Sequence, residues 1–410
     1  MKSRITLSQL ALYFTCGSVI SILFSIAISD ILLALALATL LLSGEKMRFP
    51  PILWPLVAFA TGTVISMMLS GDPASGKPQV RKFLLYFGIP LIVYSTVKSL
   101  ELVKAVLLAA TGVMSLSAIW SFVQFNRKVN AAHELGKNWY DYYTSERITG
   151  FQSHWMTLGG QEMMIVLLAG ALLFFGVGKK WKPWVLAALA LILASLVAGF
   201  TRSIWLGTFL GGMYLLWLWK RWFVIAAPVL LLMLLAVNPF ALRERVISSV
   251  QPHGDTDSNQ FRYVCRRAGY EMIKAHPWFG VGPEQVKAQL PKWIPADIPR
   301  PLPTGWYGHL HNIYIHFAAE RGIPTALALM WLLGKITYDF AMAVRRGNFN
   351  SPDGGDARAI LQGGIAMMIG MLVVGFYEVN LGDSEVLMLF LSLVTFGYVA
   401  ADSAGKASAA

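Results

Sequence analysis

The stretch that decides the fold runs from residue 179 to residue 221 and reads KKWKPWVLAALALILASLVAGFTRSIWLGTFLGGMYLLWLWKR. It holds two apolar runs, 184–200 and 203–219, and each is about long enough to cross some 30 Å of hydrocarbon as a helix. Basic residues flank the pair on both sides, and Arg202 begins the second run. The positive-inside rule places both flanks in the cytoplasm and Arg202 at the outer surface. The stretch therefore predicts two consecutive membrane spans.

The same pattern continues through the whole chain. Of its 410 residues 56% are hydrophobic and only 14% are charged, whereas a soluble chain would be nearer to about a quarter charged. The first apolar run continues far beyond the length of a signal peptide, so we expect it to remain as a span. The sequence predicts an all-α polytopic membrane protein with about twelve transmembrane helices: 8–26, 28–44, 51–70, 83–98, 101–125, 155–178, 184–200, 203–219, 222–239, 323–344, 359–379 and 384–401.

Basic residues recur at every second boundary between these runs, and this regularity sets the topology. By the positive-inside rule these boundaries and both termini face the cytoplasm. The residues are Lys2 and Arg4, then Lys46 and Arg48, Lys98 and Lys104, Lys179, Lys180 and Lys182, Lys220 and Arg221, and Arg345, Arg346 and Arg358. The predicted division is nine spans in 1–238, an outward loop subdomain in 239–310, three spans in 311–401, and a cytoplasmic tail in 402–410.

The long outward loop between spans nine and ten should contain short helices. Residues 260–275, QFRYVCRRAGYEMIKA, have the pattern of an amphipathic helix, and HPWFGVGP at 276–283 ends it with two prolines and two glycines. Residues 295–306 are rich in proline and should be extended. The two cysteines, Cys16 and Cys265, predict no disulfide, and no Cys/His spacing is typical of a zinc site.

Several outward cations stand directly beside apolar runs. Arg81, Lys82 and Arg202 could extend to lipid phosphates, or they could line a basic cavity for an anionic, lipid-linked substrate. Arginine suits the second role because its planar fork donates two parallel hydrogen bonds to phosphate oxygens. Arg202 has a further feature that favours an anion: a helix that begins there adds the positive potential of its N-terminus.

Arg262 and Arg266 lie four residues apart and would share one face of the amphipathic helix. Like charges at this spacing repel one another, so the pair predicts an anion between them, or a nearby acid such as Asp255, Asp257 or Glu271. Gly207 and Gly211 also lie four apart, and there the spacing indicates close helix packing rather than chemistry.

The stretch GHLHNIYIHFAAERG at 308–322 gathers three histidines at the start of an apolar run. They could be interfacial residues satisfied by backbone or water, or one could be a general base. If a helix begins near His311, Glu320 lies about half a turn away from it, while His309 could fold back toward His311. His309 and His311 could also bind a metal, but no carboxylate is placed locally to complete its ligands. We therefore expect neither a metal nor another cofactor.

HPWFGVGPEQV at 276–286, followed by HLHNIYIHFAAERGIP at 309–324, resembles the signature of the O-antigen ligase/polymerase superfamily of bacterial inner-membrane glycosyltransferases. The resemblance covers roughly residues 190–380. It implies a donor glycan on undecaprenyl pyrophosphate at the periplasmic face. A ligase moves that glycan to a sugar hydroxyl of lipid A–core, and a polymerase moves it to the next repeat unit.

By position, the resemblance implies roles for individual residues. His311 corresponds to the base, although the additional His309 leaves two candidates for that role. Arg202, Arg262 and, less specifically, Arg147 correspond to arginines expected to bind the pyrophosphate, while Arg81 and Lys82 match by location only. Arg266 joins this set because of its spacing to Arg262 and not because of the resemblance. We also expect supporting roles for His309, Asn312 and Glu320, with Glu320 acting mainly on stability because it points away from His311.

The sequence thus predicts an O-antigen ligase of the inner membrane, metal-independent and inverting, with its active site facing the periplasm. Its expected partners are the lipid-linked donor, the lipid A–core acceptor and membrane lipids, and not nucleic acid. Two alternatives stay open. One is the polymerase of the same superfamily, and the other is a transporter of an anionic lipid-linked solute, which should show inverted repeats and broken spans near the bilayer midplane.

Overall fold

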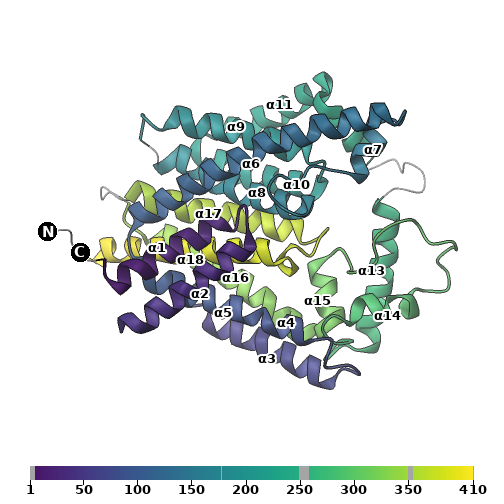
Figure 1. Ribbon diagram of the computed structural model, residues 1–410, viewed down its shortest axis with the longest axis horizontal. Coiled ribbons are helices and arrows are strands. Elements are labelled where there is room, and N and C mark those ends of the chain that lie inside the picture. The colour runs from purple at the N-terminus through teal and green to yellow at the C-terminus, as the bar shows by residue number, and fades with distance from the viewer. Residues whose placement is uncertain (1–4, 177, 249–257, 350–353, 410) are drawn as a thin grey trace.

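The computed structural model describes residues 5–176, 178–248, 258–349 and 354–409, and within these ranges the chain forms helices and no strands (Figure 1). Each predicted span falls on a helix. These helices are α1 (Leu7–Ser21), α2 (Ile26–Ser43), α3 (Leu53–Leu69), α5 (Phe83–Thr96), α6 (Leu100–Glu134), α8 (Trp155–Ala171) with the π-helical η1 (Leu172–Gly176), α9 (Lys182–Ala198), α10 (Arg202–Trp219), α11 (Phe223–Val237), α16 (Ile323–Arg346), α17 (Gly354–Val374) and α18 (Ser384–Ala409).

Six of these helices are long and apolar enough to cross a membrane, or up to seven if the bent pair Phe223–Val237 and Pro239–Ile247 forms one span. Three further apolar helices, α1, α3 and α9, are shorter. The all-helical, multi-pass character is confirmed, while the number of about twelve spans stays a prediction. Length is one reason for the difference, because α3, α5 and α9 are helices of only 14 to 17 residues.

The core of the helical body lies around α8, α17 and α18, which have many buried residues. α10 packs closely on α17. A Cβ added to Gly211 would lie 2.7 Å from the Ala366 carbonyl oxygen, and one added to Gly207 would lie 2.8 Å from that of Gly370. The predicted packing role of the two glycines is confirmed. In contrast, α11 has no buried residue and lies at the periphery.

The remaining helices are short and include those of the long loop: α4 (Lys77–Arg81), α7 (Trp139–Ser145), η2 (Pro239–Ala241), α12 (Leu242–Ile247), α13 (Ser258–Ala275), α14 (Gln285–Trp293), α15 (Ile313–Arg321) and η4 (Asn380–Gly382). α13 confirms the amphipathic helix predicted for 260–275. Its apolar face forms a small separate core with α14, made by Cys265, Ala268, Met272, Val286 and Leu290. Both cysteines are free, as predicted.

The two chain termini lie at one end of the molecule, and α13 and α14 lie at the opposite end (Figure 1). The part of the long loop that follows α13 is fixed to the helical body through the break between α15 and α16. Three backbone hydrogen bonds of 2.8–2.9 Å make this junction, from Val281 to Ala319, from Gly282 to Glu320 and from Ile323 to Pro277. The position of α13 relative to α15 is therefore set by the turn that ends α13.

Two glycines allow this close approach. Gly280 and Gly322 have φ of +66° and +85°, which favours glycine. A Cβ on Gly280 would lie 2.3 Å from the Glu320 carbonyl carbon, and a Cβ on Gly322 would lie 2.1 Å from the Trp278 carbonyl oxygen. The two motifs, HPWFGVGP and ERGIP, are thus the two halves of one contact.

Candidate active site

His311 lies directly before α15 rather than on it. Asn312 is the N-cap residue, and its Oδ1 accepts a hydrogen bond of 2.9 Å from the Ile315 N–H. The amide of Asn312 also donates to the Phe376 carbonyl at 3.1 Å, which ties the start of α15 to the end of α17. A helix does begin near His311, as expected; its first residue is Ile313, because the Asn312 side chain satisfies a free N–H group of the first turn. His311 itself has a left-handed φ of +47°.

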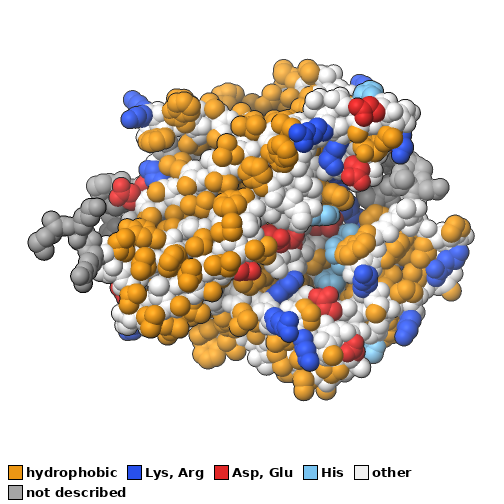
Figure 2. Space-filling view, viewed as in Figure 1, with side chains coloured by type: hydrophobic (Ala, Val, Ile, Leu, Met, Phe, Trp, Pro, Cys, Tyr) orange, Lys and Arg blue, Asp and Glu red, His pale blue; other side chains and the backbone are white. Residues whose placement is uncertain are grey.

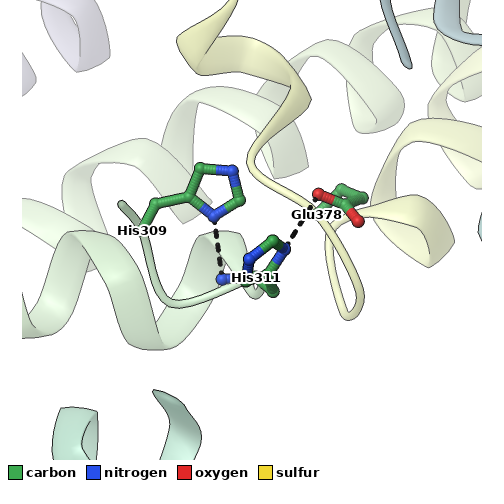
Figure 3. Close-up of side chains that lie close together, drawn as sticks. All are labelled: His309, His311 and Glu378. Carbon is green, nitrogen blue, oxygen red and sulfur yellow. Dashed lines mark hydrogen bonds and ion pairs between the residues drawn. The ribbon is translucent and has the colours of Figure 1, made fainter. Parts of the chain in front are cut away.

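The imidazole of His311 is buried, and each of its two nitrogens faces a hydrogen-bond acceptor; Figure 3 shows the one on the Glu378 side. Nδ1 lies 3.3 Å from a carboxylate oxygen of Glu378, and Nε2 lies 3.0 Å from the Trp306 carbonyl oxygen. A carboxylate and a carbonyl only accept. Nδ1–H therefore donates to Glu378. Nε2 can donate to the Trp306 carbonyl only when it also carries a proton.

His309 supports His311 through the backbone. Its Nδ1 accepts the His311 backbone N–H at 3.0 Å (Figure 3), so the two residues close a tight local turn. Burial, and next the neighbouring His311, lower the pKa of His309 to about 2. A neutral ring with Nδ1 already accepting is suited to holding the left-handed conformation of His311.

Glu378 follows α17 and was not predicted from the sequence. It is buried, and it forms an ion pair with Arg262 in addition to its contact with His311. Burial alone would raise the pKa of this carboxyl group, but the charge of Arg262 and the hydrogen bond with His311 outweigh it and lower the pKa to about 2. A signal was present in the sequence, because Glu378 is the only charged residue between Arg358 and Asp383.

Four arginines from distant segments lie near one another at this end of the molecule. Burial, and then the charges of the other three, lower the pKa of Arg147 to about 9, which leaves it protonated at neutral pH. Mutual repulsion of this kind is relieved by an anion. The four are Arg147 before α8, Arg202 at the start of α10, Arg245 on α12 and Arg262 on α13.

Three of these arginines donate hydrogen bonds to neutral oxygens. Arg147 donates to the Thr144 carbonyl at 3.0 Å, Arg245 donates to the Phe200 carbonyl at 3.0 Å, and Arg202 donates to Ser248 and Asn259 at 3.3 Å each. Arg245 was missed in the sequence because it lies on a short helix without a recognisable motif. The structure thus brings together three of the predicted anion ligands, Arg147, Arg202 and Arg262, and adds a fourth.

The other predicted anion ligands lie elsewhere. Arg266 is exposed on α13, and Arg81 is exposed at the end of α4. Lys82 donates to the Gly382 carbonyl, and the charges acting on it are those of Glu284, Arg321, Asp383 and Glu320. None of these three cations is among the charges that act on Arg147.

The carboxylate that pairs with Arg262 is not one of the three acids expected near it. Glu271 pairs with Lys274 at 2.7 Å, and Asp255 and Asp257 lie outside the described residues. Glu378 occupies this place instead, and the reason is tertiary, since the end of α17 meets the start of α15.

Glu320 belongs to a second buried group below the α15–α16 break. It contacts Arg321 at 2.9 Å and His316 at 3.7 Å, and Arg321 donates onward to Thr63 and Gln79 on the α3–α4 side. These contacts join α15 to α3 and α4. The ion pairs of Glu320 are thus with Arg321 and His316 and not with His311.

His309, His311 and Glu378 each offer one possible metal-ligand atom, and these atoms lie within 4.8 Å of one another. The sequence-based reason against a metal, that no carboxylate is nearby, was therefore wrong, because Glu378 arrives from a distant segment. The contacts present favour a hydrogen-bonded base instead. Nδ1 of His309 is already an acceptor, and the carboxylate of Glu378 is paired with Arg262, whose charge opposes a cation.

One part of the surface differs from the rest of this face of the molecule (Figure 2). Figure 2 shows acidic and histidine side chains in a hollow between the helical body and the end that carries α13 and α14, whereas the body itself is mainly hydrophobic on this face. A polar hollow at the end of an apolar bundle is suited to a substrate with a charged head and a lipid tail.

Residues 187–330 match the family model for O-antigen ligase. The matched segment runs from α9 into α16 and contains Arg202, Arg262 and His311. No curated protein matches the chain. The match supports membership of the O-antigen ligase/polymerase superfamily, while Arg147 and Glu378 lie outside the matched segment.

Proposed function

We propose that this member of the O-antigen ligase/polymerase superfamily is a ligase, which moves an O-antigen glycan from undecaprenyl pyrophosphate to a sugar hydroxyl of lipid A–core. The observation that carries the proposal is a buried histidine, His311, joined through Glu378 to Arg262, which is one of four arginines that lie near one another. Transfer from a lipid pyrophosphate needs both, a base for the incoming hydroxyl and positive charge for the leaving group.

In the proposed reaction, Arg147, Arg202 and Arg262 bind the pyrophosphate. Nε2 of His311 takes the proton of the acceptor hydroxyl as that oxygen forms a bond to the anomeric carbon. The bond from this carbon to the pyrophosphate oxygen breaks, and its electron pair leaves with the pyrophosphate. The guanidinium groups stabilise the charge that develops there, and the single displacement inverts the anomeric carbon.

The base must be free to receive a proton before this step. Nε2 faces the Trp306 carbonyl at 3.0 Å, so the acceptor hydroxyl would take the place of that carbonyl when it binds. Guanidinium groups would do the work that a divalent metal does in many sugar transferases, which makes the proposed reaction metal-independent.

We place the protein in the bacterial inner membrane. In the proposed orientation the site faces the periplasm and both termini face the cytoplasm. Two observations support it. The site and the termini lie at opposite ends of the molecule (Figure 1), and the basic flanks of the predicted spans favour the cytoplasm for the terminal end.

Deletion of the gene, followed by gel electrophoresis of the lipopolysaccharide, tests the proposal. If the protein is a ligase, the deletion strain should contain core without glycan and should accumulate lipid-linked polymer. The wild-type gene should restore glycan on the core, and a His311→Ala variant should not. Core carrying a single repeat would instead identify the polymerase. An unchanged ladder would contradict both activities.

A further inference from the structure

Glu378 contacts two functional side chains at once. One carboxylate oxygen pairs with Nη2 of Arg262, and the other lies 3.3 Å from Nδ1 of His311. The three residues come from the region after α17, from α13 and from the turn before α15. A single buried carboxylate thus joins the proposed donor-binding arginine to the proposed base.

Arg262 has a hydrogen-bond donor that its described neighbours do not use. Its Nε is buried and has no hydrogen-bond partner among the described residues. An unpaired buried donor of a charged group is costly, so the atom indicates a missing acceptor. A pyrophosphate would supply it with charged oxygens that bind the planar guanidinium in two parallel hydrogen bonds. Such a ligand competes directly with Glu378 for Arg262.

We propose that Glu378 couples donor binding to the base. The inference rests on the proposed function of the site. Without donor, the carboxylate is shared between Arg262 and His311. When the pyrophosphate draws Arg262 toward itself, the carboxylate is left to His311 alone. It then holds Nδ1–H, directs Nε2 to the acceptor hydroxyl and stabilises the imidazolium that forms when the proton arrives.

Glu378 is a positioning residue in this scheme, because it acts through His311 and Arg262 and does not touch substrate. The proton moves from the acceptor hydroxyl to Nε2 of His311, and Glu378 remains ionised throughout. Deprotonation of the acceptor is therefore favoured only after the donor has bound. The donor must bind before the acceptor hydroxyl loses its proton.

Glu378→Gln tests the coupling, since glutamine has nearly the same shape without the charge. Two quantities are measured with purified protein in lipid vesicles, kcat for glycan transfer and the affinity for undecaprenyl pyrophosphate alone. We expect kcat to fall by about 10²–10⁴. We expect the affinity to stay the same or to increase, because Arg262 loses a competitor.

Two results would overturn the proposal. An unchanged kcat would show that the charge of Glu378 does not assist His311. A lower kcat together with at least tenfold weaker binding of undecaprenyl pyrophosphate would show that Glu378 merely anchors Arg262. If the glutamine variant does not fold, Glu378→Asp replaces it. The shorter side chain displaces the carboxylate by about 1 Å or more, so kcat should fall by about 10- to 100-fold, and a wild-type kcat overturns the proposal.

Glu320→Gln is the matched control. Glu320 is also a buried glutamate between an arginine and a histidine, at 2.9 Å from Arg321 and 3.7 Å from His316. The Glu320→Gln substitution should lower the thermal midpoint and leave kcat of the folded protein unchanged. His311→Ala distinguishes a failure of the proposed base from a failure of the proposed coupling. If it turns over normally, the proposed base is wrong. If it is inactive while Glu378→Gln is fully active, only the coupling fails.

Discussion

Arg262 is the arginine in the site whose surroundings point most clearly to a bound anion, because its Nη2 pairs with a buried carboxylate while its buried Nε has no described partner. We expect Arg262→Ala to lose transfer by about 10²-fold or more, since removing one member of a buried charged pair costs about 2–5 kcal/mol. Arg262→Lys should restore little, because an ammonium group lacks the planar fork. Transfer assays on membranes with matched protein levels measure both variants.

Arg267→Ala is the control for Arg262 on the same helix. Arg267 pairs with the exposed Asp297 and with Tyr263, away from the site, so its removal should leave transfer close to the wild-type level. Near-normal transfer by Arg262→Lys would mean that Arg262 is a surface anchor rather than a pyrophosphate ligand.

His309 makes a prediction about pH. Burial and the neighbouring His311 lower its pKa in the folded protein to about 2, whereas an unfolded histidine titrates near about 6.5. As the pH falls below about 6.5, the unfolded state gains a proton that the folded state does not take up, so stability falls. His309→Asn keeps an acceptor for the His311 N–H and removes this titration.

The thermal midpoint of the His309→Asn variant should therefore decrease less than that of the wild type between pH 7.5 and pH 5, as measured in the same detergent. Some decrease should remain, because burial also lowers the pKa of His154 and of His316. Equal decreases in both proteins would contradict a buried, neutral His309.

At the scale of single residues, the sequence indicated His311, Arg262 and their neighbourhood but not the connection between them. Glu378 was missed because its contacts depend on the end of α17 meeting a turn that precedes it by more than sixty residues, as in the pair with His311. The helix start at Ile313 could have been predicted, since an asparagine before an apolar run is a common N-cap.

At the scale of elements, the contact between α10 and α17 offers a matched pair of substitutions. A Cβ on Gly211 would lie 2.7 Å from the Ala366 carbonyl oxygen, whereas one on the adjacent Gly212 meets nothing within 4 Å. Gly211→Ala should destabilise the protein by about 1–3 kcal/mol through overpacking. Gly212→Ala should be neutral or slightly stabilising, because alanine favours helix more than glycine does.

Thermal midpoints of the two glycine variants, purified in the same detergent, measure this difference. Equal midpoints would mean that α10 and α17 are not in close contact at Gly211. The comparison needs no activity assay and therefore tests the packing of the helical body separately from the site.

Among the elements, α13 could be predicted because an amphipathic pattern and a following Pro/Gly turn are both local. The junction that the turn makes with the α15–α16 break could not. It depends on a φ of +66° at Gly280 and +85° at Gly322, and on two backbones approaching one another from separate parts of the chain. The sequence showed both glycine-containing motifs without showing that they touch.

At the scale of the whole molecule, the predicted topology can be tested by labelling single cysteines in intact cells. Asp297 is exposed at the end that carries α13 and α14, and Lys180 is exposed in the connection before α9. In a background without Cys16 and Cys265, an impermeant reagent should label Asp297→Cys and not Lys180→Cys. The reverse pattern would invert the proposed orientation.

Apolar runs predicted the helical body well because hydropathy is a local property. They predicted the number of spans less securely, because whether a short helix such as α5 or α9 crosses the bilayer depends on its tilt and its neighbours. Arg202 lies at the start of α10 and Arg262 lies on α13, which is not a predicted span, whereas the binding residues of a transporter would lie near the bilayer midplane.

The most direct test of the central claim is glycan transfer by the purified protein in vesicles that contain lipid-linked donor and lipid A–core acceptor, with a metal chelator present. The wild type should transfer glycan under these conditions. His311→Ala should be slower by about 10²–10⁴ while it binds undecaprenyl pyrophosphate as tightly as the wild type. Full turnover by His311→Ala, or no transfer by the wild type until a metal is restored, would contradict a metal-independent transfer with His311 as its base.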